Sequence, residues 1–208
     1  MLVLTVCVVL AGMAIPRLLN VVYAAKLRGA MANFSSLLES SRIYAIRDNR
    51  FYSIYILATS GSSPQEAYVD MLPKSLTGAS GNGGTSVAAG DPVIAISSEV
   101  APQSASTAPS TSTLASQLLP STTTVTPTDA STATSPATFG PRGLPCLILT
   151  VTQGSASGSV CDSSGGPVAY WIFFKDGRSG NWGAITVTPA GRIQKWYYDF
   201  GSSVWARA

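Results

Sequence analysis

The sequence predicts an α+β fold in which one long N-terminal helix packs on an antiparallel β-sheet. Residues 1–15 carry no charge, and apolar residues then recur at helical spacing to about residue 48. In the C-terminal third, aromatic and β-branched segments alternate with turns that contain Gly and Pro. One helix followed by short antiparallel strands is typical of α+β domains, in which the apolar face of the helix covers the sheet.

The composition favours a scaffold over an enzyme. The chain has 208 residues, of which 46% are hydrophobic and only 11% are charged, against about a quarter in an ordinary soluble domain. It contains no His, which excludes Ser–His–Asp catalysis, Cys–His catalysis and His-ligated zinc. The net charge of +3 is too small to indicate nucleic-acid binding by bulk electrostatics. We therefore expect no catalytic residue, no cofactor and no metal.

Residues 1–48 are predicted to form one helix, kinked or loosened at Pro16. The uncharged stretch 1–15 spans about 22 Å as a helix, which is short of the ~30 Å hydrocarbon core of a bilayer. Basic residues follow this stretch and do not precede it, which is unlike a secretory signal peptide. A signal anchor followed by an ordinary helix is the alternative interpretation. The residues expected to face lipid or partner helices are Leu2, Val3, Leu4, Val6, Val8, Val9, Leu10, Met13, Ile15 and Pro16.

Three shorter elements are expected between the helix and residue 100. Residues 51–58 are rich in aromatic and β-branched side chains and predict a strand. Residues 63–66 read Ser-Pro-Gln-Glu, a capping box with Pro at the first helical position, and predict a short helix that ends near Pro73. Residues 91–96 predict a short strand.

Residues 101–138 are dominated by Ser and Thr, with Asp129 as the single charge. Such a tract buries too little apolar area to offset its chain entropy, so we expect it to lie outside the core. It resembles an O-glycosylated segment, and an unmodified surface insertion is the alternative.

The C-terminal third predicts four strands, at residues 146–151, 168–174, 182–188 and 192–199, joined by turn-rich segments. The chain is thereby divided into a membrane or assembly helix (1–50), the start of a head domain (51–75), an insertion (76–138) and the C-terminal β part of the head (139–208).

The three cysteines do not have the spacing of zinc ligands. Cys146 and Cys161 flank a Gly/Ser-rich loop and are expected to form a disulfide, which would stabilise the fold by roughly 3 kcal/mol. Two free buried thiols are the alternative. Cys7 lies in the apolar stretch, where it would act as a small hydrophobic residue.

Two groups of residues carry a family resemblance. An apolar stretch that ends Ala14-Ile15-Pro16, followed by a helix with Arg and Lys and then by a β-rich domain, resembles the type IV pilin superfamily. The segments FGPRGLP (139–145) and WGAITVTPAGRIQKWYYD (182–199), with Trp205 shortly after, resemble the head domain of GspH/FimT-type pseudopilins. The resemblance covers residues 1–58 and about 139–206.

The resemblance implies a non-catalytic structural subunit, most similar to a minor pseudopilin, of a type II secretion pseudopilus or a type IV pilus. Its helix would anchor the chain in the inner membrane, with a periplasmic head, and would later pack against other pilin subunits in the filament. The family's basic leader and its glutamate near the mature N terminus are absent. We expect that about six mature residues precede Met1, which would lengthen the apolar stretch to a full span of roughly 21 residues.

The sequence is compatible with two other functions. Arg178, Arg192 and Lys195 lie on or beside the last predicted hairpin, near Trp196 and Tyr197, and would suit a nucleic-acid backbone, as in a DNA-uptake minor pilin. In that subgroup the turn reads Gly-Arg-x-Arg, whereas here Gln194 replaces the second Arg. The simpler interpretation is that Arg192 caps a turn and that the aromatic residues are core. The other function is a major filament subunit with O-glycans on residues 101–138, and a secreted substrate is a further possible partner.

Overall fold

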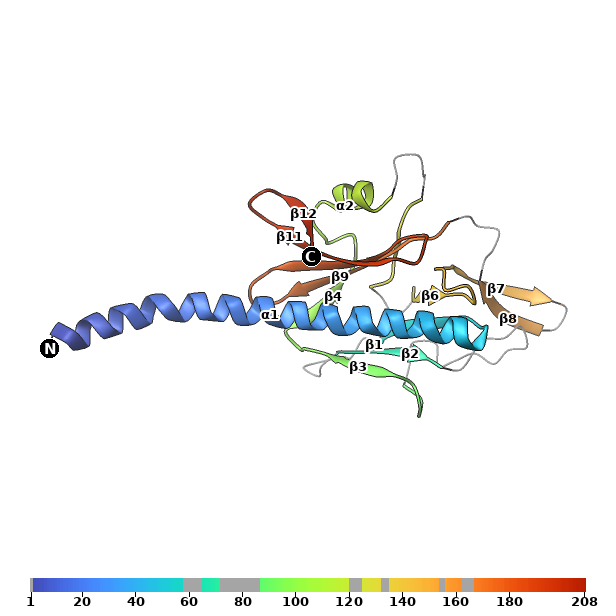
Figure 1. The fold of residues 1–208 in the computed structure, drawn as a ribbon, viewed down its shortest axis with the longest axis horizontal. Coiled ribbons are helices and arrows are strands. Elements are labelled where there is room, and N and C mark those ends of the chain that lie inside the picture. The colour runs from blue at the N-terminus through green and yellow to red at the C-terminus, as the bar shows by residue number, and fades with distance from the viewer. Residues whose placement is uncertain are drawn as a thin grey trace.

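The computed structural model describes residues 2–57, 65–71, 87–119, 125–131, 135–153, 156–161 and 167–208. For residues 2–18, 148–153 and 156–161 it describes the backbone alone. Within these ranges the chain forms one long helix, two main sheets that pack on it, a separate hairpin and a short second helix (Figure 1).

The first element, α1 (Leu2–Asp48), confirms the predicted long helix. It is continuous through Pro16, so the expected loosening there does not interrupt the helix. The helix ends because Asn49 adopts a left-handed conformation (φ 51°), and the Arg50 amide then bonds to the Ala45 carbonyl at 3.1 Å. Asn is one of the residues that adopt this conformation at helix ends.

The first sheet has the order β3-β2-β1-β6 and is antiparallel throughout. Its strands are β1 (Tyr52–Leu57), β2 (Gln65–Asp70), β3 (Val93–Ile96) and β6 (Ala137–Phe139). The strands predicted at 51–58 and 91–96 are confirmed.

The short helix predicted after residue 63 is wrong, because β2 occupies that position. Ala67, Tyr68 and Val69 are buried, and the Tyr68 ring stacks on Tyr55 of the neighbouring strand at 5.7 Å. Pairing with β1 and β3 on both sides outweighs a local capping signal, since helix propensity is a weak preference that tertiary contacts override.

The second sheet has the order β12-β11-β10-β9-β4, and β5 pairs in parallel with β9. Its strands are β4 (Val100–Gln103), β5 (Thr128–Asp129), β9 (Tyr170–Asp176), β10 (Trp182–Val187), β11 (Ile193–Asp199) and β12 (Val204–Arg207). A separate hairpin consists of β7 (Ile148–Gln153) and β8 (Ala156–Cys161). The four strands predicted in this third of the chain are therefore present, with ends displaced by a few residues.

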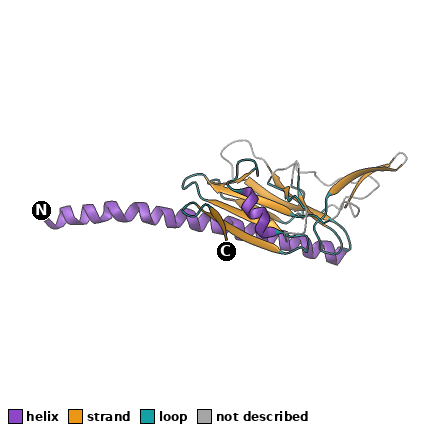
Figure 2. Cartoon of the chain, turned by 90° about the horizontal axis from the view of Figure 1, so that it is seen from above, coloured by secondary structure: helices purple, strands orange, loops and turns teal. Residues whose placement is uncertain are grey.

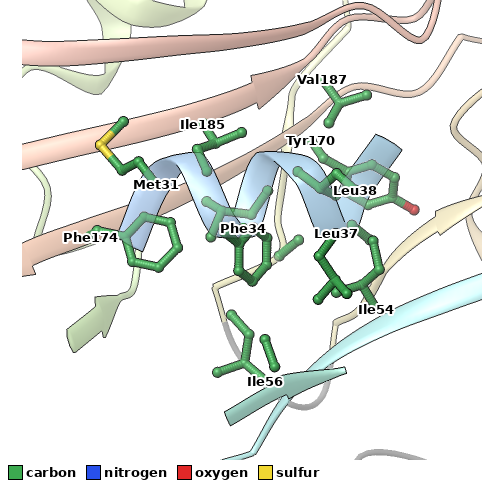
Figure 3. Close-up of a cluster of buried hydrophobic side chains, with 14 of the residues drawn as sticks. Met31, Phe34, Leu37, Leu38, Ile54, Ile56, Tyr170, Phe174, Ile185 and Val187 are labelled. Carbon is green, nitrogen blue, oxygen red and sulfur yellow. The ribbon is translucent and has the colours of Figure 1, made fainter. Parts of the chain in front are cut away.

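The main core lies between α1 and the two sheets (Figure 3). Met31, Phe34 and Leu38 of α1 are fully buried there. The first sheet contributes Ile54 and Ile56, and the second contributes Tyr170, Phe174, Ile185 and Val187. The helix thus covers both sheets with one apolar face, as the α+β prediction requires.

A second helix, α2 (Thr111–Leu118), lies over the opposite face of the second sheet. It buries Leu114 against a cluster that contains Trp182, Trp196 and Trp205. The Trp205 indole N–H donates to the Pro109 carbonyl at 3.0 Å and ties this segment to β12.

The expectation that residues 101–138 lie outside the core is therefore wrong for the described parts of this tract. They supply most of β4, all of α2, β5 and most of β6, and Ala130 and Ala137 join the main core. Asp129, the only charge of the tract, accepts hydrogen bonds from the amides of Ala105 (2.7 Å) and Ser131 (3.0 Å). A few well-placed apolar residues and one carboxylate are enough to fold a tract whose average composition indicates a solvated chain.

Candidate functional site

The two ends of α1 have different surroundings (Figures 1 and 2). From Leu27 onward one face of the helix is buried in the head, whereas residues 2–26 extend beyond it. We call residues 2–26 the uncovered segment and residues 27–48 the covered segment. The side chain of Val21 in the uncovered segment is 66% exposed, and the neighbouring Leu19 and Val22 are also exposed.

The uncovered segment includes every residue that the sequence assigned to membrane or assembly contacts. The backbone of these residues is helical, and their side chains lie outside the described part of the structure. At 1.5 Å per residue the uncovered segment extends about 37 Å. Among the residues whose side chains are described, no helix has the length and apolar character needed to cross a membrane.

Two basic residues hold α1 where it enters the head. The Lys26 ammonium group pairs with the Glu99 carboxylate at the turn before β4. The Arg28 guanidinium lies over the Tyr197 ring of β11, 5.8 Å from its centre. Contacts on both sides of the helix therefore set the direction in which the uncovered segment leaves the head.

A third basic residue, Arg42, joins α1 to two glycine turns. Its guanidinium donates to the Gly191 carbonyl at 3.1 Å. Gly143 and Gly191 both have positive φ (+70° and +76°), and a Cβ on Gly191 would lie 2.7 Å from the Gly143 carbonyl oxygen. These turns belong to the two head segments that carry the family resemblance, and they meet on the helix. Nothing in the sequence singled out Arg42, because a solvated Arg on an amphipathic helix has the same pattern.

The three residues considered for nucleic-acid contact do not form one surface. Arg178 lies in the turn before β10 and Arg192 in the turn after it, about 20 Å apart along a strand of this length. Lys195 lies within β11 and is only partly exposed.

The aromatic residues next to them serve the fold. Trp196 is buried in the cluster under α2, and its indole N–H donates to the Thr186 hydroxyl at 2.9 Å. Tyr197 packs against the main core on the opposite face of β11. The interpretation of these aromatic residues as core is confirmed.

Cys146 forms a disulfide. Cys161 lies in β8 opposite Ile148, two residues from Cys146 along the chain, so its backbone position suits the predicted pairing. The pairing itself stays a prediction. The Tyr170 hydroxyl donates to the Cys146 carbonyl, and burial raises the pKa of Tyr170 to about 12.

The end of the covered segment is held by a small polar cluster. The Asp48 carboxylate accepts hydrogen bonds from the Arg47 guanidinium (2.7 Å) and the Tyr52 hydroxyl (2.7 Å). The hydrogen bond from Arg47 is the main cause that lowers the pKa of Asp48 to about 2. Burial, assisted by the bond to Asp48, raises the pKa of Tyr52 to about 12. This cluster fixes the turn between α1 and β1.

In the part of the chain that the structure describes, no group of three His, Cys, Asp or Glu side chains is placed to hold a metal ion. Comparisons with protein-family models, with curated proteins and with solved structures give no match. A functional proposal therefore depends on this chain's own residues and geometry.

Proposed function

We propose that this protein is a non-catalytic structural subunit of a type II secretion pseudopilus or a type IV pilus, with a minor, GspH/FimT-type role. The observation that carries the proposal is the division of α1: the head covers only one half of a 47-residue helix. The other half is apolar in sequence and extends from the head without a covering element from the described residues. Such a surface needs a lipid or protein environment.

In this proposal the uncovered segment first sits in the inner membrane, with the head on the periplasmic side. On assembly it leaves the lipid and packs against the same segment of other subunits. Lipid tails are as apolar as the side chains, so the exchange depends on close helix packing and not on the hydrophobic effect. The contacts of Lys26, Arg28 and Arg42 would transmit the position of the helix to the head.

A scaffold fits the geometry better than a DNA-binding subunit does. The proposed DNA contacts at Arg178 and Arg192 lie at opposite ends of β10, and their aromatic neighbour Trp196 is buried. Glycans on the Ser/Thr tract and abundance as a major subunit stay predictions, which intact-mass measurement of isolated filaments would test.

Reconstitution into liposomes tests the membrane part of the proposal. The full chain is expected to float with the vesicles and to resist extraction at high pH, whereas Val6→Asp combined with Val9→Asp should lower the bound fraction at least fivefold. Val93→Asp, at a position on β3 that is 49% exposed, is the matched control and should leave binding unchanged. Equal binding by all three proteins would contradict the proposal.

Recovery of sheared filaments from the native cell tests the assembly part. The wild-type chain is expected in the filament fraction by mass spectrometry. Val21→Asp combined with Val22→Asp, just outside the head, should reduce that amount about tenfold while total protein stays constant. A chain that is absent from filaments and from their accessory complexes would refute a filament role.

A further inference from the structure

The end of the head that faces the uncovered segment can be located from contacts between α1 and the second sheet. Arg42 contacts Gly191 in the turn before β11, and Arg28 contacts Tyr197 near the end of that strand. The two helix positions are about 21 Å apart, and the two strand positions are about 20 Å apart. The helix and β11 therefore run side by side in opposite directions.

This register places two turns at the level of Val21 and Val22. Phe200, three residues beyond Tyr197, lies about 10 Å further toward the N terminus of α1, which corresponds to six or seven helical residues. Gly183, at the start of β10, lies beside Met31 and Leu27, since an added Cβ would touch both side chains. The turn that contains Arg178 precedes β10 and continues from this level toward the N terminus of α1. Figure 1 shows both turns on the side from which α1 emerges.

Val204 lies at the same end, because it pairs with Asp199. We call this group of exposed apolar and basic residues at one end of the head the basal surface: Val21, Val22, Arg178, Phe200 and Val204. Phe200 is 57% exposed and Val204 is 40% exposed. The basal surface lies at the end of the head from which α1 emerges.

The turn between β11 and β12 holds Phe200 outward. Asp199 accepts hydrogen bonds from the Gly201 amide (2.9 Å) and the Ser202 hydroxyl, and the Phe200 ring packs edge-on against Tyr198 at 5.0 Å. The Phe200 side chain is thus presented by an ordered turn.

The carboxylates near the basal surface are already engaged. Glu99 pairs with Lys26, and Asp199 is bonded within its own turn. Asp176 is buried and accepts bonds from the amides of Arg178 and Ser179. Arg178 is therefore exposed at a surface where neighbouring acids have other partners.

We propose that the basal surface rests in the headgroup layer of a bilayer that contains anionic lipids while the uncovered segment is inserted. Exposed Phe and Val side chains beside basic residues favour the boundary between headgroups and acyl chains, and Arg near it is attracted to anionic headgroups. The contact would hold the head in one orientation on the membrane before assembly. This inference depends on the membrane insertion proposed above.

Quenching by spin-labelled lipids tests the inference with the full chain in vesicles of phosphatidylcholine and phosphatidylglycerol. A bimane probe is attached at Val204→Cys or at Val93→Cys in a Cys7→Ser background, with single labelling checked by intact mass. Val93 is the matched control because it lies away from the basal surface. It pairs with Tyr68, which pairs with Tyr55 of β1, and β1 begins beside the C-terminal end of α1. Headgroup-level quenchers should reduce the Val204 signal at least threefold more than the Val93 signal.

A probe on native Cys7 distinguishes the possible failures. If deep quenchers act on Cys7 while Val204 and Val93 respond equally, the basal contact is wrong and membrane insertion stands. If Cys7 is not quenched, both proposals are wrong. If the Val204 probe is shielded in detergent in a concentration-dependent way and is not quenched by lipid, the surface binds a second copy of the chain, which also overturns the inference.

A pair of charge variants tests the lipid specificity. Arg178→Gln should lower quenching of the Val204 probe about twofold in vesicles with phosphatidylglycerol and leave it unchanged in phosphatidylcholine alone. Arg192→Gln, at the opposite end of β10, is the control and should have no effect in either. Equal effects of the two variants would contradict a specific role of the basal surface.

Discussion

The two faces of the second sheet are covered in different ways. One face, with Phe174 and Ile185, packs under the long helix α1, as the apolar periodicity of that helix predicts. The other face, with Phe173, Trp196 and Trp205, packs under the short helix α2, which comes from the Ser/Thr-rich tract. The sequence pattern therefore identifies α1, which covers one face of these strands, but does not identify α2, which covers the other.

The difference shows that a helix of eight residues is enough to pack against one face of a sheet. β9 contains Tyr-Trp-Ile-Phe-Phe, and a near-continuous apolar run indicates a strand that is buried on both faces. On the α2 side, Phe173 and three Trp residues form most of the cluster, and Leu114 is the buried side chain that α2 adds to it. We expect the packing of α2 to open more readily than that of α1, since α1 contacts both sheets and α2 contacts one.

The largest effect is expected for Phe34→Ala. Phe34 is 1% exposed, and its ring packs edge-on against Phe174 at 5.4 Å, between α1 and the second sheet. Removal of a buried Phe ring costs about 3–5 kcal/mol, through lost contacts and the cavity left behind. Urea denaturation should show this loss in the global free energy of unfolding. Asn33→Ala, at the exposed residue just before Phe34, is the control and should change the free energy of unfolding by less than about 0.5 kcal/mol.

Leu114→Ala tests whether α2 detaches from the second sheet without unfolding of the rest of the head. The substitution removes the buried side chain that joins α2 to the Trp cluster, at a cost of about 2–3 kcal/mol. Hydrogen exchange should show faster opening of the α2 amides, with the α1 and β10 amides much less affected. Gln117→Ala on the exposed face of α2 is the matched control. Uniform acceleration across the molecule would show that the two faces form one cooperative unit.

Gly183→Ala tests the close approach of β10 to α1. An added Cβ would lie 2.2 Å from the Met31 sulfur, so that side chain must move in a packed core. Overpacking of this kind costs about 1–3 kcal/mol. Thermal unfolding should show that Gly183→Ala combined with Met31→Ala is less destabilised than the sum of the single variants. Additive losses would mean that the two residues do not compete for the same space.

The smallest effect on stability near neutral pH is expected for Tyr170→Phe, at a residue on the face of the second sheet that packs against α1. Burial raises its pKa to about 12, above the ordinary value of 10, because the folded state favours the neutral phenol. The stabilisation is therefore complete below pH 10 and is lost as the pH rises through 12. Denaturation between pH 9 and 11.5 should show a decline that is shallower in Tyr170→Phe. Some decline should persist, since Tyr52 titrates in the same window. Equal slopes would contradict a buried phenol.

The parts of the fold that the sequence predicted correctly depend on local pattern. The apolar spacing of Leu27, Met31, Phe34 and Leu38 identifies the buried face of α1, because neighbours on one helix face recur every three to four residues. The strands at the C-terminal end follow from β-branched and aromatic runs between turns, and a turn with Gly191 at positive φ lies between the last two predicted strands. Each of these signals lies within one element.

The parts that the sequence predicted wrongly depend on partners far away in the chain. Residues 65–70 form a strand because β1 and β3 lie on either side, which a capping box cannot indicate. The described parts of the Ser/Thr-rich tract fold because Trp205 and Asp129 bind its backbone, although its composition suits a solvated chain.

The sequence by itself determined a long helix with one apolar face and the strands of the C-terminal third. Only the tertiary structure decided where the head stops covering α1, and that Arg178 and Arg192 lie at opposite ends of β10. It also decided that Arg42 joins the Gly143 and Gly191 turns. The physical reason is that periodicity is a property of neighbouring residues. Coverage, charge grouping and turn contacts depend on segments that only folding brings together.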